Sequence, residues 1–180
     1  MRTRTELIQQ LQSYSTKFKE EEKFVQQFLE LLKSPGSFHR DHLPGHITGS
    51  AWIVDDTKSH VLLVHHAKLN KWLQPGGHAD GDENVFRVAS REAEEETGLT
   101  NLNLLTSTFF DLDIHAIPAR SDFPEHLHYD VRFAFTASRK EKLLISDESH
   151  DIQWVPMERV GDLSQRNQSI MRMLKKSISM

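Results

Sequence analysis

Cysteine is absent from this sequence of 180 residues. Without thiols the chain can form no disulfide bond, no zinc site with thiolate ligands and no cysteine nucleophile. The absence also suits a reducing compartment. The first residues, MRTRTELIQQLQ, contain no apolar run of signal-peptide length. We therefore expect a cytoplasmic protein.

Long apolar runs and an excess of positive charge are also missing. No segment approaches the roughly 20 apolar residues of a membrane span, so we expect no membrane partner. The net charge is −4 with neutral histidines, which provides no basic field for a long nucleic acid. Any polyanionic partner would have to be held by a metal ion or by a local basic pocket.

Length and apolar spacing predict one main domain with an N-terminal addition. A chain of 180 residues suffices for a single core plus a small extension. We place a helical extension at residues 1–40 and the main domain at 41–180. The spacing within 4–33 is helical, but the charged run 19–23 leaves two helices or one broken helix equally open. The extension is either a cap on the main domain or an element for dimerisation or substrate gating.

The main domain is predicted to be α/β (α+β), a mixed sheet with helices on its faces. Strands are predicted at 46–56, 60–66, 102–115, 127–137 and 151–156, and helices at 84–97 and 165–178. The first two strands should form a hairpin, and 102–115 is either one long strand or two. Few strands are joined by βαβ crossovers, which favours a mixed sheet. On the last helix, Ile170, Met171, Leu174 and Ile178 should face the core.

The helix predicted at 84–97 has an unusual acidic end. Asp82 or Asn84 can cap its start, and Gly98 fits its end. On a helical wheel, the apolar stripe of the first half continues into three carboxylates, those of Glu92, Glu95 and Glu96. Glu94 points away from this stripe and is expected to be solvated.

Such a cluster is unfavourable without a counter-ion. Carboxylates near a helix C-terminus oppose its dipole by roughly 0.3–1 kcal/mol, and a carboxylate that faces a core loses hydration. Arg91 alone cannot neutralise three acids, whereas a hard divalent cation can. Oxygen ligands favour Mg²⁺ or Mn²⁺ over Zn²⁺. Taken alone, however, the acidic run fits a solvated helix face equally well.

The residues around the acidic run match a known motif. The matching positions are Gly77, Glu83, Arg91, Glu92, Glu95, Glu96, Gly98 and Leu99, at the spacing of the Nudix box. The chain therefore resembles a Nudix hydrolase, and WLQPGG and WVP extend the likeness over roughly 44–160. The resemblance implies a Nudix-type α/β/α sandwich that hydrolyses pyrophosphate bonds.

The resemblance also implies a set of metal ligands. Glu95 and Glu96 would be the principal ligands of Mg²⁺ or Mn²⁺, with two or three ions in the active complex. Glu92 would be a further ligand or the catalytic base. Glu83 would bind one ion indirectly or a second ion directly, and the carbonyl of Gly76 would be an additional ligand.

Two further catalytic roles follow from the same resemblance. Arg91 would orient the glutamates by ion pairing, with Glu83 among them. A second carboxylate often precedes the last strand in this family, and SDESHDIQWVP offers Asp147, Glu148 and Asp151. We favour Glu148 as the alternative base, although each of the three fits a surface acid as well.

The sequence gives weaker indications of which residues contact the substrate. The segment 113–133 joins two predicted strands and carries Arg120, His126 and His128. Arg120 would contact a phosphate. The two histidines share one strand face and would bind a phosphate or a base, unless they are edge residues. Trp72 would stack on a base or pack in the core. Of the 11 histidines, we expect two or three to line a pocket.

The predicted function is Mg²⁺- or Mn²⁺-dependent hydrolysis of a phosphoanhydride bond. The substrate would be a small nucleotide, either a nucleoside diphosphate linked to another moiety or a nucleoside triphosphate. A homodimer is compatible with the N-terminal helices. One alternative is a catalytically silent Nudix-fold module that senses a nucleotide, which the full acidic set argues against. Another is an isomerase or an mRNA-decapping enzyme, and the lack of a basic stripe argues against a long RNA.

Overall fold

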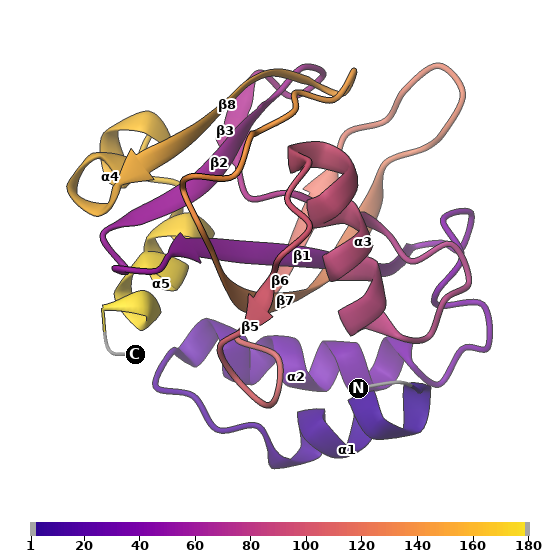
Figure 1. The fold of residues 1–180 in the computed structure, drawn as a ribbon. Coiled ribbons are helices and arrows are strands. Elements are labelled where there is room, and N and C mark those ends of the chain that lie inside the picture. The colour runs from indigo at the N-terminus through magenta and orange to yellow at the C-terminus, as the bar shows by residue number, and fades with distance from the viewer. Residues whose placement is uncertain (1–2, 179–180) are drawn as a thin grey trace.

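The computed structural model describes residues 3–178, which fold around one mixed β-sheet with helices on both faces (Figure 1). The strands are β1 (Gly45–Asp55), β2 (His60–His66), β3 (Lys71–Leu73), β4 (Gly76–His78), β5 (Asn103–Leu104), β6 (Asp111–Ile117), β7 (His126–Ala137) and β8 (Ser149–Pro156). The helices are α1 (Arg4–Ser13), α2 (Lys19–Leu31), α3 (Val85–Thr97), α4 (Val160–Leu163) and α5 (Gln168–Ser177), with a 3₁₀ turn η1 (Met157–Arg159). The predicted fold class is confirmed.

The sheet is mixed because its two central strands, β1 and β7, run parallel. The other pairs are antiparallel: β2 joins β1 to β8 on one side, and β5 and β6 share the far edge of β7. The predicted hairpin of 46–56 and 60–66 is therefore present as β1 and β2. The segment 102–115 forms two strands rather than one, because β5 and β6 pair with successive stretches of the same partner.

Strand β1 is buried along its whole length and separates two cores. Ile47 and Ile53 face the core formed with α1, α2 and α3, whereas Trp52 and Val54 face the core formed with α5. This division follows from the alternation of side chains along a strand. Helix α3 approaches the strand closely at Gly49, where a Cβ atom would lie 2.9 Å from the carbonyl oxygen of Val85.

Helix α3 begins and ends on the residues that its sequence favours. Of the two candidate caps, Asn84 is the one used: its side chain accepts a hydrogen bond from the backbone N–H of Arg87 at 3.2 Å. Gly98 ends the helix with φ of 74°, a left-handed conformation that glycine adopts without strain. These caps fix where the last turn of the helix, which carries the glutamates, meets the sheet.

Helix α5 is shorter than predicted, and of the residues expected to face the core, Ile170 and Leu174 are buried and Met171 packs against the core. Asn167 caps it by accepting hydrogen bonds from the backbone N–H groups of Ser169 and Ile170. Met173 is fully buried, whereas Ile178 is 76% exposed and does not face the core, because the helix ends before it. The expectation for Ile178 was therefore wrong.

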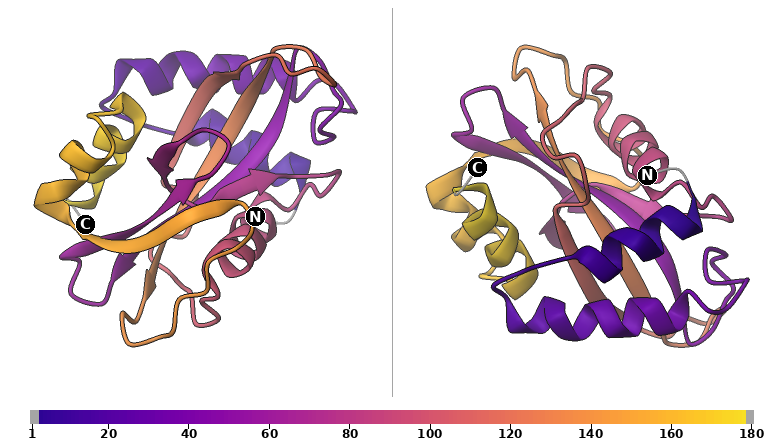
Figure 2. Two further views of the ribbon diagram at one scale, coloured as in Figure 1. Left: turned by 90° about the horizontal axis from the view of Figure 1, so that it is seen from above. Right: turned by 90° about the horizontal axis from the view of Figure 1, so that it is seen from below.

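The N-terminal segment forms two helices, and the charged run opens α2 instead of breaking it. Leu7 and Phe28 join the core beneath the sheet. The buried carboxylate of Glu21 accepts hydrogen bonds from the Lys176 ammonium of α5 at 2.6 Å and from the backbone N–H of Leu112 at 3.1 Å. Figure 2 shows α1 and α2 across one side of the sheet, with α5 next to the start of α2. These contacts tie both ends of the chain to β6.

The helices between residues 3 and 178 are all too short or too polar to cross a membrane.

Candidate active site

A cavity of about 500 Å³ lies over the polar half of one sheet face. Thr48 and Ser50 of β1 and His128 and Asp130 of β7 line it, because alternate residues of paired strands share a face. Further along β1 the same face carries Trp52, which α5 covers. The opposite wall is acidic and is formed by Glu92, Glu95 and Glu96 of α3 and by Glu148 from the loop before β8.

Glu96 is the most deeply placed of these acids, with 7% of the residue exposed. Its Oε1 accepts a hydrogen bond from the backbone N–H of Gly76 at 2.9 Å. Burial, together with the neighbouring charges of Glu92 and Glu148, raises the pKa of Glu96 to about 8. Burial also raises the pKa of Glu92. The carboxylates are therefore crowded as predicted, and the protein alone does not neutralise them.

Glu95 lies differently from the prediction that three carboxylates point inward. Its side chain is 59% exposed and forms an ion pair with Arg91 at 3.0 Å, at the rim of the cavity. Arg91 also contacts Glu92 at 2.8 Å and donates to the carbonyl oxygen of His78. The helical wheel places Arg91 on the same side as Glu95, and this pairing draws Glu95 outward. Glu94 is exposed, as expected.

Glu83 is held by the N-terminal helix and not by Arg91. Arg4 Nε donates to Glu83 Oε1 at 2.9 Å, and the backbone N–H of Arg4 donates to Glu83 Oε2 at 3.2 Å. The expected ion pair of Glu83 with Arg91 is absent among residues 3–178, and Glu83 does not line the cavity. Sequence spacing could not reveal this contact, because it joins residues 79 positions apart.

Glycines 76 and 77 allow the acidic wall to approach the sheet. A Cβ atom at Gly77 would collide with the carboxylate of Glu92, and one at Gly76 would collide with Ser50. A larger residue at Gly77 would displace the Glu92 carboxylate, and one at Gly76 would displace Ser50 of the cavity. The PGG turn therefore has a steric role beside the ligand role expected for the Gly76 carbonyl.

Of the three carboxylates considered before the last strand, only Glu148 lines the cavity. Its charge raises the pKa values of Glu92 and Glu96, which shows that it faces them across the site. Asp151 instead accepts hydrogen bonds from the backbone N–H of Ile152 and from the Gln153 side chain. This placement agrees with the preference for Glu148.

The predicted substrate residues divide into two groups. Arg120 and His128 line the cavity. His126 and Trp72 do not: His126 Nδ1 lies 2.9 Å from the carbonyl oxygen of Pro124, and Trp72 stacks on His65 with ring centroids 5.0 Å apart. The structure therefore offers no position at Trp72 for stacking on a base, and packing was the other role considered for it.

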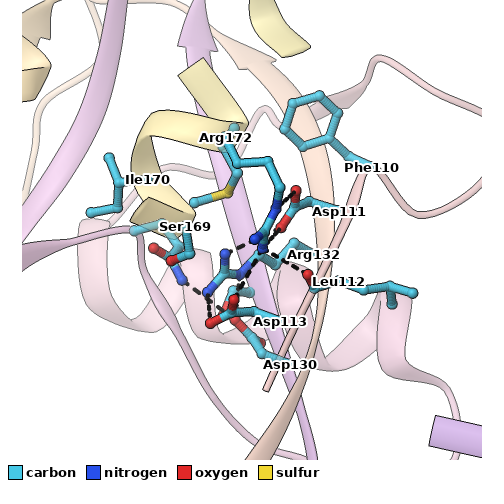
Figure 3. Close-up of polar contacts among 12 residues, drawn as sticks. Phe110, Asp111, Leu112, Asp113, Asp130, Arg132, Ser169, Ile170 and Arg172 are labelled. Carbon is cyan, nitrogen blue, oxygen red and sulfur yellow. Dashed lines mark hydrogen bonds and ion pairs between the residues drawn. The ribbon is translucent and has the colours of Figure 1, made fainter. Parts of the chain in front are cut away.

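Sequence reasoning missed the polar floor of the cavity. Asp130, 2% exposed, accepts hydrogen bonds from Ser50 at 2.7 Å and from Arg132 Nε at 2.7 Å. Arg132 and Arg172 are both buried and bridge a group of aspartates under the floor, Asp111, Asp113 and Asp130 (Figure 3). Polar residues at every second position of 126–132 could have indicated this floor.

Histidines form the end wall of the cavity. His66, His78, His115 and His128 line it, more than the two or three expected. Burial lowers the pKa values of His46 and His78 to about 4 and also lowers that of His128. These imidazoles are therefore neutral at pH 7, and the cations beside the acidic wall are Arg40, Lys68, Arg91 and Arg120.

The acidic wall has the donor chemistry that a hard divalent cation requires. Its ligands are carboxylate oxygens, and the raised pKa of Glu96 shows that its ionised form needs a compensating charge. Within the described residues, no three of these carboxylates bring their oxygens within 4.8 Å of one another. Among residues 3–178, the possible metal-ligand atoms that do all lie within 4.8 Å of one another belong to three histidines, His46, His78 and His128.

Comparison with known proteins gives consistent matches. The family model described as the NUDIX domain matches residues 45–175. A bis(5′-nucleosyl)-tetraphosphatase (asymmetrical) of Rattus norvegicus is 26% identical over 113 residues, covering 62% of this chain and 74% of the relative. An m7GpppN-mRNA hydrolase of Xenopus laevis is 32% identical over 91 residues, covering 44% of this chain and 31% of the relative. A solved Ap4A hydrolase of C. elegans shares the fold with a TM-score of 0.60 at 17% identity, covering 74% of this chain and 95% of that one.

Proposed function

The chain belongs to the NUDIX family as a pyrophosphohydrolase, and from this premise we propose that it hydrolyses a phosphoanhydride bond in a small nucleotide with Mg²⁺ or Mn²⁺. The substrate is a nucleoside diphosphate linked to another moiety or a nucleoside triphosphate. The names of the rat and Xenopus relatives both describe nucleotides joined through phosphates, which supports this class.

The observation that carries the proposal is the crowding of Glu92, Glu96 and Glu148 around one cavity. An anionic pyrophosphate would be repelled from this wall unless divalent cations lay between them. Glu92, Glu95, Glu96 and the carbonyl of Gly76 would hold two or three such ions. When bound, these ions offset the charge of the bridging oxygens and lower the pKa of a coordinated water.

The other residues of the site have separate roles. Arg91 positions Glu92 and Glu95 through its ion pairs. Glu148 lines the cavity and is the base that accepts the proton of the attacking water. Glu92, which also lines the cavity, is the alternative base. Lys68 and Arg120 line the cavity and would contact the phosphates that the metal ions leave exposed. Glu83 contributes only if it separates from Arg4.

A nucleotide sensor without turnover is the second function that this fold could serve. A sensor needs a pocket but has no need of the two buried carboxylates Glu92 and Glu96, whose raised pKa values show that the metal-free site disfavours their ionised forms. The structure therefore favours the hydrolase.

Two further proposals concern the whole protein. We infer a cytoplasmic location from the lack of cysteine. A homodimer through the N-terminal helices also stays a prediction.

A substrate panel tests the proposed function. The full-length protein is incubated with dinucleoside polyphosphates, nucleotide-diphosphate conjugates and nucleoside triphosphates, with Mg²⁺, with Mn²⁺ or with a chelator. We expect phosphate-containing products from at least one class, only in the presence of metal. Tight binding of a panel member without product under any metal condition would support the sensor instead.

A further inference from the structure

A group of histidines at the end of the cavity is not used by the proposed hydrolysis. The sheet register brings its members together: His46 of β1 pairs with His128 of β7, and His78 of β4 lies opposite Thr48 of β1. One ring nitrogen from each of these three histidines lies within 4.8 Å of the others. The ring centroids of His46 are 5.2 Å from His78 and 4.9 Å from His128.

Three ring nitrogens of this group, two of His46 and one of His128, are buried without a hydrogen bond of ordinary geometry. His46 is 1% exposed, and among residues 3–178 its ring nitrogens have only a weaker contact with the backbone of His42. Nε2 of His128 is also buried and has no hydrogen-bond partner among the described residues. Nearby histidines are satisfied differently, since His42 and His126 each place a ring nitrogen against a backbone carbonyl oxygen. A buried polar atom without a hydrogen-bond partner destabilises the folded protein unless a bound ligand supplies the missing interaction.

Three imidazoles within reach of one another are the ligand set of a zinc-class ion and not of Mg²⁺. Imidazole suits Zn²⁺, Cu²⁺, Ni²⁺ and Fe²⁺, whereas Mg²⁺ takes oxygen ligands. Sites with three histidines keep a fourth position open for water or a substrate oxygen. His78 and His128 both line the cavity, so the open position faces it.

We propose that His46, His78 and His128 bind one zinc-class transition-metal ion at the end of the cavity, separate from the carboxylate site on α3. The open coordination position takes an anionic oxygen of the cavity's ligand, such as a phosphate oxygen. The identity of that oxygen rests on the proposed function, whereas binding of the ion does not.

Metal binding by the whole protein tests this proposal directly. Metal-free protein is titrated with Zn²⁺ in a large excess of Mg²⁺, which occupies the carboxylates. Co²⁺ serves as the spectroscopic probe, because four-coordinate Co²⁺ absorbs visible light far more strongly than six-coordinate Co²⁺. We expect a single Zn²⁺ per chain, an intense Co²⁺ spectrum and a rise in Tm with Zn²⁺.

Substitutions of two of the histidines, compared with control substitutions, test which residues bind the ion. His78→Gln and His128→Gln should each weaken Zn²⁺ binding roughly 100-fold or more. His78 is half-buried, which makes that variant the safer one for folding. His60→Gln is the control, because His60 contacts Asp55, about 30 Å along β1 from His46. Glu96→Gln should leave Zn²⁺ binding unchanged.

The outcomes separate the new site from the proposed function. Zn²⁺ that binds to His78→Gln and His128→Gln as tightly as to the wild type would overturn the proposal, as would loss of binding only in Glu96→Gln. A wild-type protein that takes up no Zn²⁺ would overturn it as well. None of these results depends on hydrolysis, so an inactive protein could still confirm the ion site.

Discussion

At the residue scale, the acidic cluster consists of side chains with different environments. Glu96 is buried against Gly76, Glu92 is half-buried, and Glu95 lies exposed against Arg91. A helical wheel assigns these three to one face, but it cannot show where a partner such as Arg91 draws a side chain outward. The buried position makes Glu96 the residue on which the metal-free protein should depend most.

The free energy of unfolding of the metal-free protein should fall as pH rises from 7 to 8.5. Burial raises the pKa of Glu96 from 4.5 to about 8, so the folded state retains a proton that the unfolded state has already released. This proton makes stability decline with pH, by at most about 1.4 kcal/mol per pH unit. The buried histidines, whose pKa values are lowered, oppose this trend below about pH 7, where the unfolded state binds protons that they do not.

Chemical unfolding in the presence of a chelator measures this slope. Glu96→Gln should remove most of the decline between pH 7 and 8.5, whereas Glu94→Gln, at an exposed position, should retain it. An unchanged slope in Glu96→Gln would show that this carboxyl does not hold a proton in the folded state.

At the element scale, periodicity predicted most elements, and contacts between distant segments decided the rest. The strand predicted at 127–137 corresponds to β7, and the Asn84 and Gly98 signals located α3. The pairing of Arg4 with Glu83 and the floor around Asp130 were missed, because they depend on which strands and helices become neighbours. The Nudix box identified the acidic wall, but it carries no information on the histidine wall.

The contact between α2 and α5 should contribute strongly to stability. Lys176 of α5 contacts Glu21 at 2.6 Å and Asp111 at 2.9 Å, and both carboxylates are fully buried. Lys176→Met keeps most of the side-chain volume but leaves these charges without their ammonium partner. We expect the free energy of unfolding to fall by about 3 kcal/mol or more.

Denaturant unfolding at pH 7 checks this expectation against a neighbouring control. Lys175→Met changes an exposed lysine on the same helix and should alter stability by roughly 0.5 kcal/mol or less. Equal effects of the two substitutions would mean that the buried contact contributes no more than a surface lysine.

At the scale of the whole molecule, the two ends of the chain support the site without lining it. Helices α1 and α2 cover one side of the sheet and hold Glu83 through Arg4. Helix α5 covers the apolar half of the opposite face and anchors the buried arginine network beneath Asp130. The cavity remains where neither end reaches, between the glutamates of α3 and the polar half of β1 and β7.

Turnover measured against Mg²⁺ concentration, for the wild type, Glu96→Gln and Glu94→Gln, tests most directly whether carboxylate-held metal drives hydrolysis in this cavity. The substrate is the best member of the nucleotide panel. Wild type and Glu94→Gln should show the same rise of turnover with Mg²⁺. Glu96→Gln should lose roughly 100-fold or more in kcat, because its carboxylate no longer holds the ion. Full activity of Glu96→Gln, or hydrolysis by the wild type in excess chelator, would contradict the proposed mechanism.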